Sequence, residues 1–176
     1  SNDGLIMTNH HVIDNSTEVR VIFEDGRMYE ANIIGSDRLT DIGLVKIVAS
    51  NLIPISIGNS DKMLVGDLAV AIGHPLTLGA APTVTTGVVS ALERRLDVGG
   101  DLMGSSVTLF GLIQTDAPIT RGSSGGALIN KNGELIGITT AIATADVGAE
   151  GLGFAVPINL ALNIAEDLIK DGKILH

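Results

Sequence analysis

The segment Arg121-Gly122-Ser123-Ser124-Gly125-Gly126-Ala127 is the most distinctive stretch of this chain. Glycines on both sides of the serine pair leave the Ser124 hydroxyl approachable and allow backbone N–H groups to turn toward one point. Such a turn can serve as an oxyanion hole, which stabilises negative charge during acyl transfer. A Gly/Ser-rich connecting loop without chemistry is the alternative, and the local string alone leaves both interpretations open.

The same segment matches the pattern G-x-S-x-G through Gly122, Ser124 and Gly126. In α/β-hydrolases this motif requires a helix directly after the serine and a histidine later in the chain. Here residues 127–130 are predicted to form a strand that leads into a hairpin, and the only later histidine is His176. The context therefore excludes an α/β-hydrolase.

Short β-rich segments, broken by Gly, Asp and Asn, fill most of the remaining sequence. Asp25-Gly26 and Asn132-Gly133 each separate two such segments and predict hairpins, because these pairs accept positive φ angles. Many strands with frequent turns favour an antiparallel barrel or sandwich. We predict strands at residues 4–8, 18–23, 29–35, 42–48, 67–73, 83–92, 111–115, 127–130, 135–143 and 152–156.

One helix is predicted, beginning after Pro157 and ending at Asp171-Gly172, because apolar residues recur between them at helical spacing. The polar segment 57–66 is interpreted as the join between two lobes. We therefore expect an N-terminal β-barrel lobe at 1–60 that lacks its first strand, a C-terminal β-barrel lobe at 61–157 and a helix with tail at 158–176. Residues 94–107 and 143–151 are predicted to be long irregular loops.

Composition excludes several classes of function. Hydrophobic residues make up 45% of the chain, which supports a buried core, and the net charge of −9 disfavours binding to a phosphate backbone. The chain has no cysteine, so disulfides, thiolate metal sites and thiol catalysis are excluded. No metal or cofactor motif is found, and neither a membrane span nor a targeting segment is expected within this chain.

A nucleophilic serine needs a base, and the base needs an orienting carboxylate. Two of the four histidines, His10 and His11, lie together in Thr8-Asn9-His10-His11-Val12-Ile13, and Asp41 opens a later apolar segment. The resulting order, histidine then aspartate then serine, is that of the chymotrypsin-type double barrel.

With these segments in this order, the chain resembles the protease domain of the HtrA/Deg family of serine proteases. The resemblance covers nearly the whole chain and implies an all-β, chymotrypsin-like double antiparallel β-barrel with a C-terminal α-helix. It rests on TNHHVI (8–13), TDIGLVKI (40–47), QTDAPITRGSSGGAL (114–128), NGELIGITTAI (132–142) and GLGFAVPINLALNIAEDL (151–168).

The resemblance also implies the roles of individual residues. His11 would be the base, and His10 would occupy a variable position of the motif. Asp41 would orient the His11 imidazole, and Ser124 would be the nucleophile. The oxyanion donors would be the backbone N–H groups of Gly122 and Ser124, with a contribution from Ser123. Asp37, close to Asp41 in the sequence, is predicted to be a solvated turn residue.

The family resemblance further implies a substrate site. The segment 139–142 would offer an edge to which an extended peptide adds as a strand, so that Thr140, Ala141 and Ile142 contact substrate. Ile119, Ala141 and Ile142 would line a small apolar pocket and favour small aliphatic P1 residues. Ordinary core packing is the alternative for Ile119 and Ile142.

By resemblance, the protein would degrade unfolded or damaged proteins without ATP, in the periplasm, the cell envelope or outside the cell. A catalytically silent peptide-binding or chaperone module with the same fold is the alternative. Arg121 replaces a proline usual in the family, and His74 replaces a frequent asparagine, the latter expected to be structural. The family's first strand, its trimerising arm and its PDZ domain lie outside residues 1–176, so the resemblance does not carry the family's homotrimer over to this chain.

Overall fold

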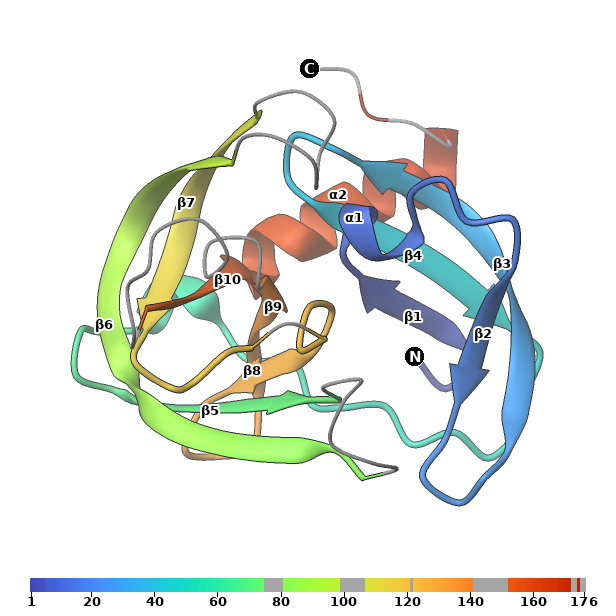
Figure 1. Cartoon of the computed structure of the whole chain (residues 1–176), viewed down its shortest axis with the longest axis horizontal. Helices are drawn as coiled ribbons and strands as arrows, with labels where there is room; N and C mark the ends of the chain where they lie inside the picture. The colour runs from blue at the N-terminus through green and yellow to red at the C-terminus, as the bar shows by residue number, and fades with distance from the viewer. Residues whose placement is uncertain (75–80, 99–106, 121, 141–151, 172–173, 175–176) are drawn as a thin grey trace.

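The computed structural model of the chain describes residues 1–74, 81–98, 107–120, 122–140, 152–171 and 174. Two curled antiparallel sheets lie side by side, and a helix near the C-terminus runs between them (Figure 1). The all-β architecture of two antiparallel sheets with a C-terminal helix is thereby confirmed, with one difference from the expected double barrel: the second sheet is a closed barrel, whereas the first is a four-stranded sheet.

The first sheet contains the N-terminal strands in the order β1-β4-β3-β2. A short helix, α1 (His10–Ile13), directly follows its first strand. The strands are β1 (Leu5–Thr8), β2 (Val19–Ile22), β3 (Met28–Asp37) and β4 (Ile42–Ile47).

The second sheet closes into a barrel with the order β10-β7-β6-β5-β8-β9. A 3₁₀ turn, η1 (Ser60–Lys62), lies in the connection that precedes it, within the segment interpreted as the join. The strands are β5 (Leu68–Gly73), β6 (Thr83–Val98), β7 (Val107–Thr115), β8 (Ala127–Ile129), β9 (Leu135–Thr140) and β10 (Gly153–Pro157).

Both predicted hairpin turns are confirmed. Gly26 lies between β2 and β3 with φ 84°, and Gly133 lies between β8 and β9 with φ 76°. These positive φ angles are the conformation that glycine accepts without steric cost. Local turn chemistry therefore located these two connections correctly.

The prediction of an irregular loop over residues 94–107 was wrong at its N-terminal end, and β7 is longer than the strand predicted at 111–115. β6 continues to Val98 and β7 begins at Val107, because the two strands remain paired through several register shifts. Thr108 Oγ1 donates to Asp97 Oδ1 over 2.6 Å, and Arg95 also donates to this carboxylate. These hydrogen bonds, that of Thr108 above all, lower the pKa of Asp97. The other predicted loop, 143–151, lies outside the described residues.

The segment TNHHVI leaves β1, whose end at Thr8 agrees with the strand predicted at 4–8, and continues into a short helix that was not predicted. Only Thr8 belongs to β1, and His10–Ile13 form the helix α1. Four residues are too few to show a helical hydrophobic period, so this helical turn could not be predicted from the pattern of residues.

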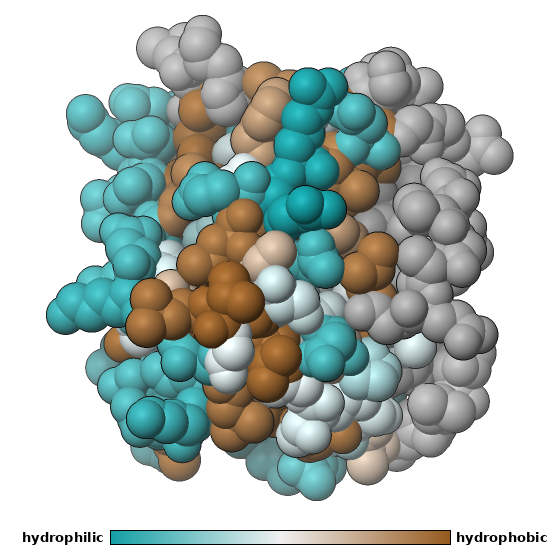
Figure 2. Space-filling view, turned by 90° about the vertical axis from the view of Figure 1, so that its left-hand side faces the viewer, coloured by the Kyte–Doolittle hydropathy of each residue, from teal (hydrophilic) through white to brown (hydrophobic). Residues whose placement is uncertain are grey.

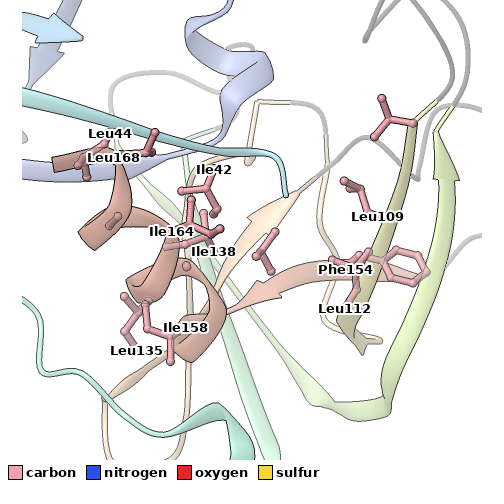
Figure 3. Close-up of a cluster of buried hydrophobic side chains, with 14 of the residues drawn as sticks. Ile42, Leu44, Leu109, Leu112, Leu135, Ile138, Phe154, Ile158, Ile164 and Leu168 are labelled. Atoms are coloured by element: carbon pink, nitrogen blue, oxygen red, sulfur yellow. The ribbon is translucent and has the colours of Figure 1, made fainter. Parts of the chain in front are cut away.

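The helix α2 (Ile158–Asp171) has the bounds expected from its apolar spacing, and its buried face joins the two sheets. Ile158, Ile164 and Leu168 belong to one buried cluster with Ile42 and Leu44 of β4 and with strands of the barrel (Figure 3). Because residues of both sheets pack on the same helix face, α2 fixes the first sheet relative to the barrel.

The face of the barrel opposite the first sheet carries a band of hydrophobic residues with hydrophilic residues beside it (Figure 2). Large exposed side chains of the barrel strands include Leu68, Val84 and Phe110. No helix in the described part of the chain is both long enough and apolar enough to cross a membrane.

Substitution of Leu168 by Ala should lower the free energy of unfolding by about 2–5 kcal/mol, because it opens a cavity between the helix and both sheets. The neighbouring Ile169 is 55% exposed, whereas Leu168 is 0% exposed, and Ile169→Ala should cost less than about 1 kcal/mol. Chemical denaturation of both variants measures the difference. Equal losses would contradict the assigned role of the buried face of α2.

Candidate active site

His11 and Asp41 lie in direct contact. His11 Nδ1 is 2.9 Å from Asp41 Oδ1 and 2.9 Å from Oδ2, and the backbone N–H of His11 donates to Oδ1 over 3.1 Å. The His11 side chain is 12% exposed, whereas that of Asp41 is 0% exposed. The carboxylate therefore fixes the imidazole through Nδ1.

The backbone conformation of Asp41 and the hydrogen bonds to its carbonyl hold this carboxylate in position. Asp41 adopts φ 57°, a left-handed conformation that aspartate tolerates better than most residues. Its carbonyl accepts hydrogen bonds from the His10 N–H, at 3.2 Å, and from Asn9 Nδ2, at 3.0 Å. Asp41 is thus fastened to the α1 turn through both its carbonyl and its side chain.

The neighbouring acid and histidine occupy other positions. His10 Nδ1 lies 2.8 Å from Ser36 Oγ on β3, so this imidazole points away from Asp41. Asp37 accepts hydrogen bonds from the N–H and the hydroxyl of Thr40 and is 6% exposed. The prediction of a solvated turn residue is therefore wrong: Asp37 is the buried last residue of β3, and its carboxylate caps the turn that follows.

Thr140 at the end of β9 links the barrel to this pair. Its hydroxyl donates to Asp41 Oδ2 over 3.1 Å, and the residue is fully buried. The sequence analysis assigned Thr140 to substrate contact and missed this bond. The available signal was a polar pair, Thr139-Thr140, within an otherwise apolar strand, because buried hydroxyls require partners.

The segment that contains Ser124 folds into two successive turns. The Ser123 N–H donates to the Thr120 carbonyl over 2.9 Å, and the Gly126 N–H donates to the Ser123 carbonyl over 3.1 Å. The third residues of these turns, Gly122 and Gly125, have φ 92° and 79°. Glycine accepts such a positive φ without steric cost, which explains why glycines occupy these two positions.

The first of these hydrogen bonds concerns the predicted oxyanion donors. Because the Ser123 N–H is engaged with Thr120, it is not available to a bound anion in this conformation. The contribution expected of Ser123 is therefore absent in this conformation, and Gly122 and Ser124 stay predictions of the family resemblance.

The segment 122–126, which contains Ser124 and is called the serine loop below, lies between the two sheets. A Cβ atom on Gly125 would collide with Thr8 Oγ1 at the end of β1, which directly precedes the histidine-bearing turn. On the other side, a Cβ atom on Gly73 would come within 2.7 Å of Ser123 Cβ. The two glycines allow the loop to sit next to α1 and to the end of β5. Close packing thus places the residue after Ser124 against Thr8, which leads into the turn that carries His11.

The predicted substrate residues are only partly within the described chain. Ile119 is 5% exposed and packs in the barrel core, whereas Ala141 and Ile142 lie outside the described residues. The predicted peptide-binding edge cannot include Thr139, because its N–H donates to Gly126 and its carbonyl accepts from Gly125. Within the described residues, no three His, Cys, Asp or Glu side chains gather in a way that could hold a metal ion.

The fold and the site define a trypsin-like peptidase. Residues 1–138 match the family model described as a trypsin-like peptidase domain. The chain belongs to this family, and within it to the HtrA/Deg type of serine proteases.

Two curated relatives from Escherichia coli (strain K12) illustrate the similarity. The chain is 49% identical to the periplasmic pH-dependent serine endoprotease DegQ over 172 residues, which are 97% of this chain and 36% of DegQ. It is 46% identical to the periplasmic serine endoprotease DegP over 172 residues, 97% of this chain and 34% of DegP. The chain thus spans about a third of the length of these relatives.

Solved structures agree with this assignment. The HtrA-type protease AlgW with a decapeptide superimposes with a TM-score of 0.85 and 41% identity, covering 98% of this chain and 50% of AlgW. The serine endoprotease from Yersinia pestis gives a TM-score of 0.81 and 41% identity, covering 99% and 57% of the two chains. These comparisons give no support to a catalytically silent module.

Substitution of Gly125 by Ala should destabilise the chain more than substitution of Gly133 by Ala. Both glycines have similar positive φ angles, 79° and 76°, so the backbone strain of about 1–2 kcal/mol is matched. Only the Cβ at position 125 would meet Thr8, which adds about 1–3 kcal/mol of overpacking. Chemical denaturation compares the two variants, and equal losses would disprove the close packing of the serine loop on β1.

Proposed function

We propose that this chain is the protease domain of an ATP-independent serine endopeptidase that cleaves unfolded or damaged proteins by acyl-enzyme hydrolysis. The observation that carries the proposal is the buried carboxylate of Asp41. It holds His11 Nδ1 at 2.9 Å and accepts the Thr140 hydroxyl from the barrel, next to the loop that contains Ser124. The family to which the chain belongs supports the same reaction class.

In the proposed mechanism, His11 acts through Nε2, because Nδ1 is held by Asp41. Nε2 removes the proton from Ser124 Oγ as the oxygen attacks the carbonyl carbon of a peptide bond. The same nitrogen then gives the proton to the departing amine, and the acyl-enzyme is hydrolysed by water in the reverse sequence. Asp41 holds the required tautomer and stabilises the imidazolium that forms transiently.

The negative charge that develops on the substrate carbonyl oxygen needs donors that are already in place. The backbone N–H groups of Gly122 and Ser124 are proposed for this role. The positive φ of Gly122 and the turn closed by Ser123 support a defined loop rather than a freely moving one. Loss of one such donor typically lowers kcat about 10²- to 10³-fold.

The substrate class is proposed from the family and from the predicted pocket. Peptide substrates would bind in extended form to the segment beyond Thr140, and small aliphatic P1 residues would enter a pocket to which Ile119, Ala141 and Ile142 contribute. The names of DegQ and DegP place those two proteins in the periplasm, which supports a periplasmic location for this protein. Peptides bound in the AlgW structures support binding of peptide substrates.

Labelling with a fluorophosphonate tests the nucleophile and the base in the protein that contains this chain. The reagent should label Ser124, and Ser124→Ala should abolish the reaction. His11→Ala should lower the labelling rate by at least about 10³-fold, since the serine loses its base. His10→Ala is the matched control, because His10 contacts Ser36 rather than Asp41, and it should label at close to the wild-type rate.

Two results of this experiment would contradict the assignment. Labelling that persists in Ser124→Ala would place the nucleophile elsewhere. Loss of labelling in His10→Ala but not in His11→Ala would exchange the roles of the two histidines.

The proposed specificity is tested with peptides that differ only at P1. Cleavage after Val or Ala should exceed cleavage after Arg or Phe by at least about tenfold in kcat/KM, because a small apolar pocket excludes large or charged side chains. Preferred cleavage after Arg would disprove the pocket while leaving the serine mechanism intact.

A further inference from the structure

Thr139 is a buried residue of β9 that the proposed mechanism does not use. It is 1% exposed and makes three hydrogen bonds to the serine loop. Its N–H donates to the Gly126 carbonyl over 3.0 Å, and its carbonyl accepts from the Gly125 N–H over 2.9 Å. Its hydroxyl donates to the Ser123 carbonyl over 2.5 Å. Thr139 therefore contacts the residues on both sides of Ser124.

The hydroxyl contact differs from the other two because it is made by a side chain. Any residue at position 139 would keep the two backbone hydrogen bonds, but only a hydroxyl of this length reaches the Ser123 carbonyl. Glycine at position 126 leaves room for this contact, since a Cβ atom there would collide with the Ile72 carbonyl oxygen and would lie 2.9 Å from both the Ser123 carbonyl oxygen and Thr139 Oγ1. The absence of a side chain at 126 and the presence of a hydroxyl at 139 are thus complementary.

The Ser123 carbonyl belongs to the same peptide group as the Ser124 N–H. A peptide group is planar and trans, so its C=O and its N–H point in opposite directions. A donor that fixes the direction of the Ser123 carbonyl also fixes the direction of the Ser124 N–H. This N–H is one of the two proposed oxyanion donors.

We infer that Thr139 is a positioning residue whose hydroxyl orients the Ser123–Ser124 peptide group and thereby aims the Ser124 N–H at the developing oxyanion. The inference rests on the proposed function, because it assigns a purpose to the same loop. Thr139 itself contacts neither substrate nor reacting atoms in this scheme. The Gly126 N–H also donates to the Ser123 carbonyl, so this carbonyl keeps a donor when the Thr139 hydroxyl is removed.

Two matched pairs of variants isolate the hydroxyl. The first pair is the wild type and Thr139→Val, whose side chains have the same shape and differ only in that a methyl group replaces the hydroxyl. The second pair is Thr139→Ser and Thr139→Ala, whose smaller side chains differ only in the presence of the hydroxyl. In each pair the form with the hydroxyl should have a kcat about tenfold higher. This loss is smaller than the effect of about 10²- to 10³-fold for removing an oxyanion donor outright, because the bond from Gly126 remains. The second pair answers the question if Thr139→Val does not fold.

Three readouts distinguish positioning from a purely structural role. KM for a peptide substrate should stay within about twofold, because the donor acts on the transition state rather than on the bound substrate. Inhibition by a peptide boronate, which forms a tetrahedral adduct, should weaken by the same factor as kcat. The loss should be equal at every pH from 5 to 9, since the partners of Thr139 are backbone groups that do not titrate.

The inference is overturned if both pairs show equal kcat, or if the loss falls on KM while inhibition by the boronate is unchanged. It is also overturned if Thr139→Ser is impaired as much as Thr139→Ala, because the methyl group would then be responsible. Failure of the proposed function is recognised separately, since wild-type protein would then show no Ser124-dependent labelling at all. If the wild type is labelled and all Thr139 variants are labelled at the same rate, the role of Thr139 is disproved and the proposed function stands.

Discussion

The structure depends on one buried carboxylate. Asp41 has no exposed side-chain surface, and such a group is stable in the interior only when it is hydrogen bonded on all sides. Its partners come from both halves of the molecule, the α1 turn on one side and Thr140 of β9 on the other. The requirement to satisfy this carboxylate therefore fixes the histidine turn relative to the barrel.

The two threonines at the end of β9 form hydrogen bonds to different parts of the site. Successive side chains of a strand point to opposite faces, so Thr139 and Thr140 reach different partners. Thr140 meets the carboxylate of Asp41, and Thr139 meets the carbonyl that precedes Ser124. One rigid strand, paired with β8 and β10, thus positions both the acid and the serine loop.

The helix α2 supplies the framework for this arrangement. Its apolar face packs on β4 and on the barrel in a single buried cluster (Figure 3). Hydrophobic contacts of this kind are not directional, so they hold the two sheets together but do not define the geometry of the site. Directional hydrogen bonds at Asp41 and at the serine loop then supply that geometry, which is why both kinds of interaction are needed.

The sequence by itself determined the number and location of most strands, the two hairpin turns and the bounds of α2, because hydrophobic period and turn chemistry are local properties. It also singled out His11, Asp41 and Ser124 as candidates through their motifs and order. Tertiary structure alone decided the length of β6 and β7, since pairing overrides polar composition. It alone decided the bond from Thr140 to Asp41 and that from Thr139 to Ser123, because these partners are distant in the chain and meet only when the sheets pack together.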